Sequence, residues 1–525
     1  MLRKQITDNY SVSDQISLAN IETLSQLGIT LIICNRPDNE EEGQLSFAEV
    51  EALAKEKNMN AVHIPFTGGQ MQPSDVEAFK AVIKGGDNIH AYCRTGNRSS
   101  IIWQAATETS STTPSDDMTF DVVIVGAGTA GISTAASLLK RKPDLSICLI
   151  DPATNHFYQP GWTLVGGGVF KAESTRRNMS DVIPKGTKWL KESVKTFHPN
   201  DNKVTLENGH HIGYQYLVVA AGIKLNWDAI EGLSETLGRN GVTSNYRYDL
   251  APYTWELSQN LKDGKAIFTQ PPMPIKCAGA PQKAMYLSCD HWFKQDTLNN
   301  IDVSFYNAGG VLFGVAEYVP ALQSYIEKYQ ITTNFNHNLV KVDGPNKRAY
   351  FAAKDENDQP TVVETEFDML HVCPPQSAPD FIRNSPLVDD AGWVNVDKET
   401  LQHTAFDNIW SLGDVANTPN AKTMAAVRKQ APVVAQNIVD ALQGHSIRAI
   451  YDGYGSCPLT VEKGKIVLAE FGYGGTLMPT FPNWLNNGTK ATRLAWILKE
   501  DLLPPFYWHG MLKGYEWFVS PKMRK

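Results

Sequence analysis

The sequence contains few cysteines and no long apolar segment. Seven of its 525 residues are cysteine; because they are scattered, we expect no framework of structural disulfides, and any reactive pair is better explained by catalysis. No Cys-x-x-Cys or His-x-x-x-His spacing occurs, so no metal site is predicted. No apolar run approaches the roughly 18 residues of a transmembrane helix, and the polar N-terminus does not resemble a secretory signal. We therefore expect a cytoplasmic protein.

The chain also lacks an excess of basic residues. Its formal net charge is −8, and no basic run with interleaved aromatic residues occurs. We therefore predict no nucleic-acid partner and expect small-molecule substrates. Hydrophobic residues make up 42% of the chain, which is enough for buried cores, and the length predicts about two to four domains.

A polar stretch at residues 108–118 predicts a linker because it has no apolar periodicity. Before it, residues 1–107 show the pattern of a small α/β domain. Apolar runs predict strands at 29–34, 61–65 and 89–92, and helical periodicity predicts helices at 45–56 and 74–83. Asp75, in the first turn of the second helix, is expected to cap that helix rather than to act as an acid.

A cysteine-containing loop follows the strand at 89–92 and leads into a helix. It reads Cys93-Arg-Thr-Gly-Asn-Arg98-Ser. Backbone N–H groups, the helix dipole and Arg98 should lower the pKa of the Cys93 thiol and hold an anion beside it. Arg98 follows Cys93 by five residues, the spacing of rhodanese-type sulfurtransferases, whereas phosphotyrosine phosphatases use a spacing of six.

This first domain resembles the phosphatase-like family that is found fused to sulfur-metabolising proteins. The resemblance is carried by the loop from Cys93 to Ser99 and covers residues 1–107. It implies transfer of persulfide sulfur through Cys93, with Arg98 in the same site. Phosphatase activity, or a structural or docking role without activity, remain as alternatives.

Three glycines mark a dinucleotide site in the second part of the chain. Gly126, Gly128 and Gly131 follow the apolar strand 121–125 and open a helix, and Asp151 ends the next strand, twenty residues after Gly131. The glycines permit a tight turn against a pyrophosphate, and Asp151 is placed to accept hydrogen bonds from ribose hydroxyls.

Two later segments indicate FAD rather than NAD as the bound nucleotide. Residues 216–222 form a strand that ends in Gly222, and residues 409–414 end in Gly413-Asp414, whose carboxylate would meet the ribityl or pyrophosphate part of FAD. A helix expected within 418–430 would direct its N-terminus at the isoalloxazine, and Lys422 would help to stabilise the reduced ring. Alternatively, Lys422 is an ordinary surface lysine.

The second glycine fingerprint that NAD(P)H would require is missing. The strand-like run 266–269 leads into three prolines and Cys277 instead, and residues 304–311 provide no fingerprint either. Thiol chemistry is therefore a better source of electrons than NADH. A type II NADH:quinone oxidoreductase, a relative of coenzyme-A-disulfide reductase and a non-catalytic sulfide or persulfide sensor remain as alternatives.

Three motifs, at residues 151–168, 276–283 and 451–459, together resemble the sulfide:quinone oxidoreductase family, in the branch that includes the mitochondrial enzyme. The resemblance covers about residues 119–520. It implies an α/β fold with two tandem Rossmann-like domains: a FAD part at 119–255 and 375–450, a degenerate NAD-like part at 256–374, and a C-terminal segment at 476–525. By the same resemblance, FAD contacts fall at Thr129, Ala130, Asp151, Gln159, Val194 and Lys422.

The resemblance also pairs Cys277 with Cys457 as a redox disulfide beside the flavin, with Cys373 as an alternative. The remaining cysteines of this part, and one of the first domain, are expected in the core: Cys34, Cys148 and Cys289. Hydrosulfide would attack the bridge and leave a persulfide on Cys457 and a flavin-facing thiolate on Cys277. A small thiol, sulfite or cyanide would then remove the sulfur, and the electrons would pass to a quinone. If Cys93 then relays this sulfur, the enzyme would be bifunctional, with sulfide oxidation and sulfur transfer in one chain.

The C-terminal segment 476–525 is expected to lie on a membrane surface. It contains four tryptophans with basic residues between them: Trp484, Trp496, Trp508 and Trp517, with Lys490, Arg493, Lys499 and Lys513. Aromatic rings and basic side chains of this kind anchor interfacial helices, so we expect a peripheral protein on the inner face of the membrane. Alternatively, the segment packs on the enzyme's own core or on another subunit of a homo-oligomer.

Overall fold

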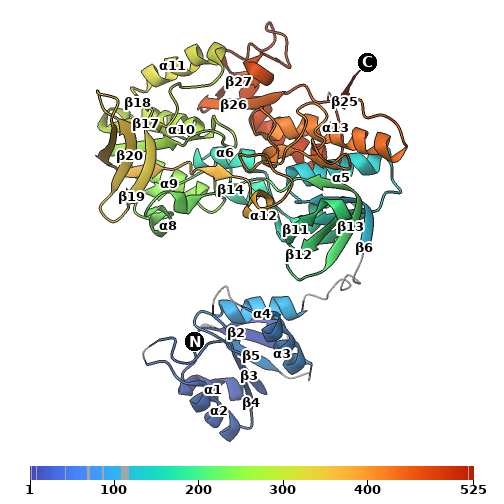
Figure 1. The fold of residues 1–525 in the computed structure, drawn as a ribbon. Helices are drawn as coiled ribbons and strands as arrows, with labels where there is room; N and C mark the ends of the chain where they lie inside the picture. Colours follow the sequence, from blue (N-terminus) through green and yellow to red (C-terminus); the bar gives the residue numbers. More distant parts are fainter. Residues whose placement is uncertain are drawn as a thin grey trace. The chain divides into compact units, whose positions relative to one another are not determined.

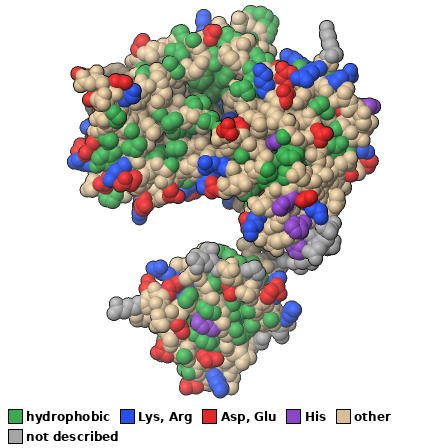
Figure 2. Space-filling view, viewed as in Figure 1, with side chains coloured by type: hydrophobic (Ala, Val, Ile, Leu, Met, Phe, Trp, Pro, Cys, Tyr) green, Lys and Arg blue, Asp and Glu red, His purple; other side chains and the backbone are tan. Residues whose placement is uncertain are grey.

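The computed structural model describes the chain except for residues 2, 8, 42, 68–70, 85–87, 108–117, 518 and 525. It divides into two compact units, Met1–Ser115 and Asp116–Lys525 (Figure 1). Most of the expected linker, residues 108–117, lies outside the described residues, and residue 118 already begins a strand. Charged side chains of both signs are interspersed on the face drawn in Figure 2.

The smaller unit is a five-stranded sheet in the order β1-β2-β5-β3-β4, with only β1 antiparallel to its neighbour. The strands are β1 Lys4–Thr7, β2 Tyr10–Ser13, β3 Leu31–Cys34, β4 Asn60–His63 and β5 Ile89–Tyr92. Four helices flank it: α1 Leu18–Gln26, α2 Phe47–Glu56, α3 Pro73–Ile83 and α4 Asn97–Thr107. One buried cluster joins the sheet to α1 and α2, and another joins it to α3 and α4.

The expected elements of this unit are present with small shifts at their ends, and β1, β2 and α1 are additional. Asp75 does act as a cap, since its Oδ2 accepts a hydrogen bond from the backbone N–H of Gln72 at 2.8 Å. Cys93 lies in the loop between β5 and α4. The parallel strands therefore deliver this thiol to the carboxyl edge of the sheet, where α/β proteins place their sites.

The first sheet of the larger unit has seven strands around β6 and β13. Its parallel part is β10 Thr187–Leu190, β7 Ile147–Ile150, β6 Met118–Val125, β13 His211–Val219 and β24 Ile409–Ser411; β12 Lys203–Leu206 and β11 Val194–His198 add an antiparallel edge. Helices α5 Thr129–Arg141 and α13 Met424–Leu442 contact each other. Residues 122–125 of β6 are all buried, as expected for a central parallel strand.

A second, five-stranded parallel sheet follows in the order β15-β22-β16-β17-β18. Its strands are β15 Val242–Thr243, β22 Met369–His371, β16 Gly264–Gln270, β17 Ile301–Asn307 and β18 Thr332–Phe335. Helices α9 Ala251–Asn260, α10 Ala280–Lys294 and α11 Val319–Lys328 accompany it, with an antiparallel sheet of β19 Asn338–Asp343, β20 Arg348–Lys354 and β21 Pro360–Glu366. Prolines directly after β16 end the strand because they cannot donate to the ladder.

The chain ends in a three-stranded antiparallel sheet and a run of short helices. These are β26 Gly455–Glu462, β27 Lys465–Phe471, β28 Ala491–Thr492, α14 Arg493–Ile497, a π-helical turn Leu498–Leu502 and α15 Leu503–His509. β26 packs against α10 of the second sheet, whereas α15 belongs to the core of the first. The chain from β26 onward therefore connects both sheets.

Candidate functional site

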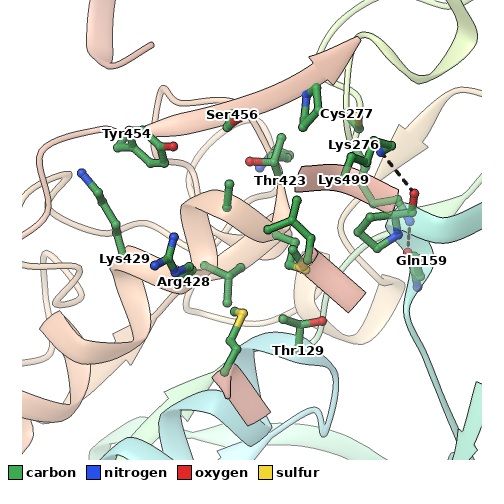
Figure 3. A pocket seen from close by; sticks show the side chains of 18 of the residues that line it. Thr129, Gln159, Lys276, Cys277, Thr423, Arg428, Lys429, Tyr454, Ser456 and Lys499 are labelled. Carbon is green, nitrogen blue, oxygen red and sulfur yellow. Dashed lines mark hydrogen bonds between the residues drawn. The ribbon is translucent and has the colours of Figure 1, made fainter. Parts of the chain in front are cut away.

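A cavity of about 1090 Å³ lies in the larger unit, and its wall includes the glycine fingerprint, the start of α13, β26 and the C-terminal helices (Figure 3). Most of the expected cofactor residues line it: Gly128, Thr129, Ala130, Gln159, Gly222, Gly413, Asp414 and Lys422. Cys277 lines it as well. The structure thus gathers residues from position 128 to position 422 around one space.

The fingerprint glycines are needed for two different reasons. Gly126 has φ +101°, and a Cβ there would lie 2.5 Å from the carbonyl oxygen of Ala220; a Cβ on Gly131 would lie 1.8 Å from the carbonyl oxygen of Gly126. Neither glycine lines the cavity, so both serve the packing of strand, turn and helix. A Cβ on Gly128, in contrast, would meet no atom within 4 Å, so this glycine faces open space. That space is where a ligand's phosphates would approach the start of α5.

Asp151 and Val194 do not line the cavity. Asp151 follows β7 directly and accepts hydrogen bonds from the N–H groups of Ala127 at 2.7 Å and Ala153 at 2.8 Å, while burial raises the pKa of its carboxyl group. Through its hydrogen bond with Ala127, Asp151 holds the fingerprint turn in place. Val194 begins β11 and is buried in the core cluster of the first sheet, with 3% of its surface exposed.

Helix α13 starts at the cavity wall. Thr423 caps it by accepting a hydrogen bond from the N–H of Ala426 at 3.3 Å. The Nζ of Lys422 donates to the carbonyl oxygens of Asp414 at 2.7 Å and Ala416 at 2.8 Å and lies 4.1 Å from the ring centre of Trp393. Burial lowers the pKa of Lys422 to about 8. Lys422 is therefore not a solvated surface lysine, because its ammonium group is bound to the loop that follows β24.

Cys277 and Cys457 meet although 180 residues separate them. Their sulfur atoms are 3.6 Å apart, which is within hydrogen-bonding reach for sulfur. Cys457 is on β26, and Cys277 lies between β16 and α10, where its N–H donates to the carbonyl of Lys422 at 3.0 Å. Cys277 has a left-handed φ of +52°, which is uncommon for a residue with a Cβ.

Two buried lysines stand beside this pair. The Nζ of Lys283 donates to Cys277 Sγ at 3.0 Å, and Lys499 lines the same cavity with 4% of its surface exposed. The hydrogen bond from Cys457 and the charge of Lys283 lower the pKa of Cys277 well below its ordinary value, and the same thiolate raises the pKa of Cys457. Burial lowers the pKa of Lys499 to about 7. Cys277 is therefore the thiolate of the pair.

The sequence patterns did not assign catalytic roles to either lysine. Lys283 belongs to the motif 276–283, so its position six residues after Cys277, at the start of α10, was an available signal. Lys499 is among the basic residues expected in an interfacial segment. That expectation was wrong for Lys499, because the π-helical turn carries its side chain into the protein toward the thiols.

Three polar side chains hold the turn that carries Cys277. Tyr246 Oη donates to the carbonyls of Lys276 at 3.0 Å and Cys277 at 3.4 Å, and Gln376 Oε1 accepts from the N–H of Lys276 at 2.6 Å. The Nζ of Lys276 bonds to Gln159, as the dashed line in Figure 3 shows. None of these contacts between distant segments could be anticipated from residue spacing.

The other cysteines of this unit are buried and inert. Cys148 and Cys289 are fully buried in β7 and α10, and burial raises the pKa of Cys148 to about 12. Cys373 is 1% exposed, packs with Tyr246, and also has its pKa raised to about 12 by burial. A thiol of this kind is a poor nucleophile at neutral pH.

In the smaller unit, Cys93 is 1% exposed and surrounded by its loop. Burial opposes ionisation, but hydrogen bonds from backbone N–H groups of the loop lower the pKa of Cys93 overall; the donors are Ser99, Thr95, Arg98 and Gly96. Arg98 donates to both carboxylate oxygens of Glu40 at 2.9 and 2.7 Å and to the carbonyl of Phe66 at 2.8 Å. The sequence patterns missed Glu40, which neutralises the arginine of this site.

Comparisons with known proteins agree with this geometry. The chain is 43% identical over 402 residues to the mitochondrial sulfide:quinone oxidoreductase of Dictyostelium discoideum, covering 76% of this chain and 86% of that protein. It is 38% identical over 406 residues to the mouse mitochondrial enzyme of the same name, covering 77% and 89%. The chain belongs to the sulfide:quinone oxidoreductase family.

Structural and profile comparisons agree with the fold of each unit. The fold matches the sulfide:quinone oxidoreductase of Aquifex aeolicus with a TM-score of 0.65 at 19% identity, covering 78% of this chain and 98% of that one. The family model for pyridine nucleotide-disulphide oxidoreductases matches residues 120–254, and the model for the phosphatase-like domain of beta-lactamase hydrolase-like proteins matches residues 2–109. These relatives do not favour the alternatives of an NADH oxidoreductase, a coenzyme-A-disulfide reductase or a sensor.

As a member of the sulfide:quinone oxidoreductase family, the chain is a flavoenzyme whose cofactor is FAD. The residues of the cavity fit this cofactor. The open face of Gly128 leaves room for a pyrophosphate at the start of α5. Among the described residues, the amide of Asn245 and the Nε1 of Trp162 are buried on the cavity wall without a hydrogen-bond partner, and buried polar atoms of this kind need a ligand or water.

The relatives change one expectation and the structure changes another. The expected cytoplasmic location is not supported, because the Dictyostelium and mouse relatives are named as mitochondrial proteins. The C-terminal segment is not uniformly interfacial: Trp496 and Trp508 are buried, whereas Trp484 and Trp517 are 84% and 51% exposed. Across the described residues, no helix combines the length and apolar character needed to cross a bilayer.

Proposed function

We propose that the larger unit oxidises sulfide at Cys277 and Cys457 and transfers the electrons to a quinone, and that the smaller unit transfers the resulting persulfide sulfur through Cys93. The observation that carries the first part is the contact of Cys277 with Cys457, at the wall of the FAD cavity and beside Lys283. The first sheet would provide the FAD-binding part, with its segments at 119–255 and 375–450. The part at 256–374, which holds every strand of the second parallel sheet except β15, would carry Cys277.

The reaction starts from the oxidised pair. Hydrosulfide attacks Cys457 Sγ, the disulfide breaks, and the products are a persulfide on Cys457 and a thiolate on Cys277. Lys283 favours this direction because its charge stabilises the departing Cys277 thiolate. A small thiol or sulfite then attacks the outer sulfur and leaves Cys457 as a thiolate. Loss of two electrons from the two thiolates restores the disulfide.

FAD, when bound, takes up these two electrons and makes them available for reduction of a quinone, which also takes up two protons. The chain's contribution to this half-reaction is an apolar part of the cavity wall. It is formed by Leu468, Met478, Phe481, Leu502, Leu503 and Phe506. An apolar stretch of cavity wall such as this one suits a hydrophobic ring.

A hydrophobic quinone requires access to a membrane, and we assign this to the exposed apolar residues of the C-terminal segment. They are Leu477, Trp484, Leu485, Leu494, Ile497, Leu502 and Trp517. Leu502 is 55% exposed and also lines the cavity, so the apolar surface continues into the cavity. Side chains of this kind insert into the lipid interface without spanning it.

Anaerobic mixing with sulfide tests the first part. We expect prompt loss of the oxidised flavin absorbance in the wild type, and loss of sulfide-dependent quinone reduction by at least ~100-fold in Cys277→Ser and in Cys457→Ser, with FAD still bound. Cys289→Ser is the matched control because that thiol is buried away from the cavity. Full activity in either serine variant, or bleaching by NADH alone, contradicts the assignment.

The role of Cys93 is tested separately. Cys93→Ser should leave quinone reduction unchanged and abolish sulfur transfer from glutathione persulfide or thiosulfate. If this variant instead loses only the hydrolysis of a phosphate ester, the smaller unit is a phosphatase.

A further inference from the structure

The C-terminal helix α15 contributes one buried tyrosine to the FAD fingerprint. Tyr507 is fully buried, and its Oη lies 2.7 Å from Thr129 Oγ1 and 2.6 Å from His156 Nε2. The other ring nitrogen of His156, Nδ1, lies 3.3 Å from the carbonyl oxygen of Ala127. A chain of hydrogen bonds therefore crosses the fingerprint turn from Ala127 to Thr129 through two side chains that are distant in sequence.

The direction of each hydrogen bond follows from its ends. The carbonyl of Ala127 can only accept, so His156 carries its proton on Nδ1. Burial lowers the pKa of His156 to about 4, so its ring is neutral and Nε2 is an acceptor. Tyr507 must then donate to His156, and its oxygen accepts from the hydroxyl of Thr129. The hydroxyl of Thr129 therefore donates its hydrogen to Tyr507. This hydrogen bond fixes the rotamer of the Thr129 side chain at the cavity wall.

Further contacts anchor the segment around Tyr507 on the same helix, α5. Glu516 accepts hydrogen bonds from Ser137 at 2.5 Å and from Arg141 at 2.5 and 2.8 Å. Gly514, with φ +71°, approaches so closely that a Cβ would lie 2.7 Å from the carbonyl oxygen of Ala136. The segment from 507 to 516 therefore packs along α5 from its first residue to its last turn.

We propose that Tyr507, acting through Thr129 and with His156, is a positioning residue of the FAD site, and that the C-terminal segment retains the cofactor as well as forming surface. Thr129 and Ala130 line the cavity at the start of α5, where the backbone N–H groups would bind the pyrophosphate of FAD. Tyr507 keeps the turn and the helix start in the geometry that these N–H groups need. Without the Tyr507 hydroxyl, Thr129 is free to change rotamer, and the turn loses the hydrogen bonds that hold it.

The test is the rate at which FAD leaves the purified holoenzyme, followed by the rise in free-flavin fluorescence. Tyr507→Phe keeps the ring and removes only the hydroxyl, and we expect FAD release at least ~10-fold faster than in the wild type, the scale of one or two buried hydrogen bonds. Tyr329→Phe is the matched control: Tyr329 is also buried, its hydroxyl donates to Asp290 and Val461 and accepts from Lys328, and it does not line the cavity. It should release FAD at the wild-type rate.

A double-mutant cycle separates positioning from general loosening of the fold. Thr129→Val removes the other end of the hydrogen bond, so its effect on FAD release should not add to that of Tyr507→Phe. Additive effects, a wild-type rate in Tyr507→Phe, or an equal acceleration in Tyr329→Phe would each overturn the proposal. Circular dichroism of the released protein measures whether the fold survives cofactor loss, and we expect an unchanged spectrum.

Discussion

At the scale of single residues, the reactivity of Cys277 depends on charges supplied by other parts of the chain. The thiolate is held by a hydrogen bond from Cys457 and by the ammonium of Lys283, both inside a buried site. Opposite charges at this distance shift a pKa by about one unit or more, because little water screens them. The backbone at Cys277 is also held in place. Hydrogen bonds with Tyr246, Gln376 and the carbonyl of Lys422 hold its left-handed turn.

Replacing Lys283 tests this charge effect. Lys283→Met should raise the pKa of Cys277, lower sulfide-dependent quinone reduction at pH 7 by roughly 10-fold or more, and regain activity as the pH rises toward the new pKa. The pH profile of kcat/KM and the rate of thiol alkylation measure the shift. Lys294→Met, on the same helix but exposed, should change neither. An unchanged profile in Lys283→Met would refute the role.

Lys499 predicts a pH dependence of stability. Its pKa is about 7 in the folded protein and near 10.5 when exposed, so the unfolded chain binds more protons between these values and stability rises with pH across that window. Below about pH 7, Lys499 is charged in both the folded and the unfolded state. The folded state then carries the full free-energy cost of burying that charge. Lys499→Met should therefore stabilise the larger unit more at pH 6 than at pH 9, by roughly 1–3 kcal/mol.

Urea unfolding at the two pH values measures this difference. Lys490→Met, in the same segment but exposed, is the control and should show no pH-dependent gain. A larger gain at pH 9 than at pH 6 would contradict the burial of a charged Lys499.

At the scale of elements, the loop between β5 and α4 combines an anion-binding backbone with a neutralised arginine. The N–H groups around Cys93 favour a thiolate or a small anion, but Glu40 takes two donors of Arg98 and is itself also bound by Arg36 at 2.7 Å. Arginine binds a phosphate dianion through donors of this kind, and Glu40 already occupies them here. The loop therefore suits sulfane sulfur better than phosphate.

Glu40→Gln should remove the carboxylate charge that pairs with Arg98, so that the arginine can bind an incoming anion. We expect inorganic phosphate to bind the full-length variant roughly 10-fold more tightly than the wild type, as measured by calorimetry. Glu41→Gln is the matched control, because Glu41 pairs with Arg36 and Arg94 and not with Arg98. Equal phosphate binding in wild type and Glu40→Gln would show that Glu40 does not set this preference.

At the scale of the whole molecule, two units with separate cores share one chain. Because the units are joined covalently, each meets the other at an effective concentration, which for linked modules is typically in the millimolar range. Sulfur released from Cys457 could then reach Cys93 before it escapes into solution. The chain would gain this advantage from covalent connection alone.

Separating the units tests this coupling. Residues 1–107 and 119–525, produced as two proteins and mixed, should oxidise sulfide at the rate of the intact chain but should transfer sulfur to Cys93 at a rate that falls on dilution. In the intact chain, that rate should not depend on dilution. Equal dilution dependence in both samples would mean that sulfur travels through solution.

Much of the fold could be predicted from the sequence because its signals are local. Strand 89–92 was placed to the residue, and β6 and the fingerprint glycines lie where apolar runs and turn residues put them. Element ends shifted by a few residues, and β1, β2 and α1 were missed. The site residues near positions 128, 222 and 413 also carry local signals, since each follows a strand that points at the same edge of a sheet.

The sequence by itself determined the chemistry available to this protein: a dinucleotide turn, a missing second fingerprint, and thiols at Cys93, Cys277 and Cys457. Only the tertiary structure decided which groups act together. It set Lys283 and Lys499 beside the thiols, Glu40 against Arg98, and Tyr507 against Thr129. The physical reason is that pKa values and hydrogen-bond directions depend on burial and on partners hundreds of residues away, and spacing along the chain does not encode those distances.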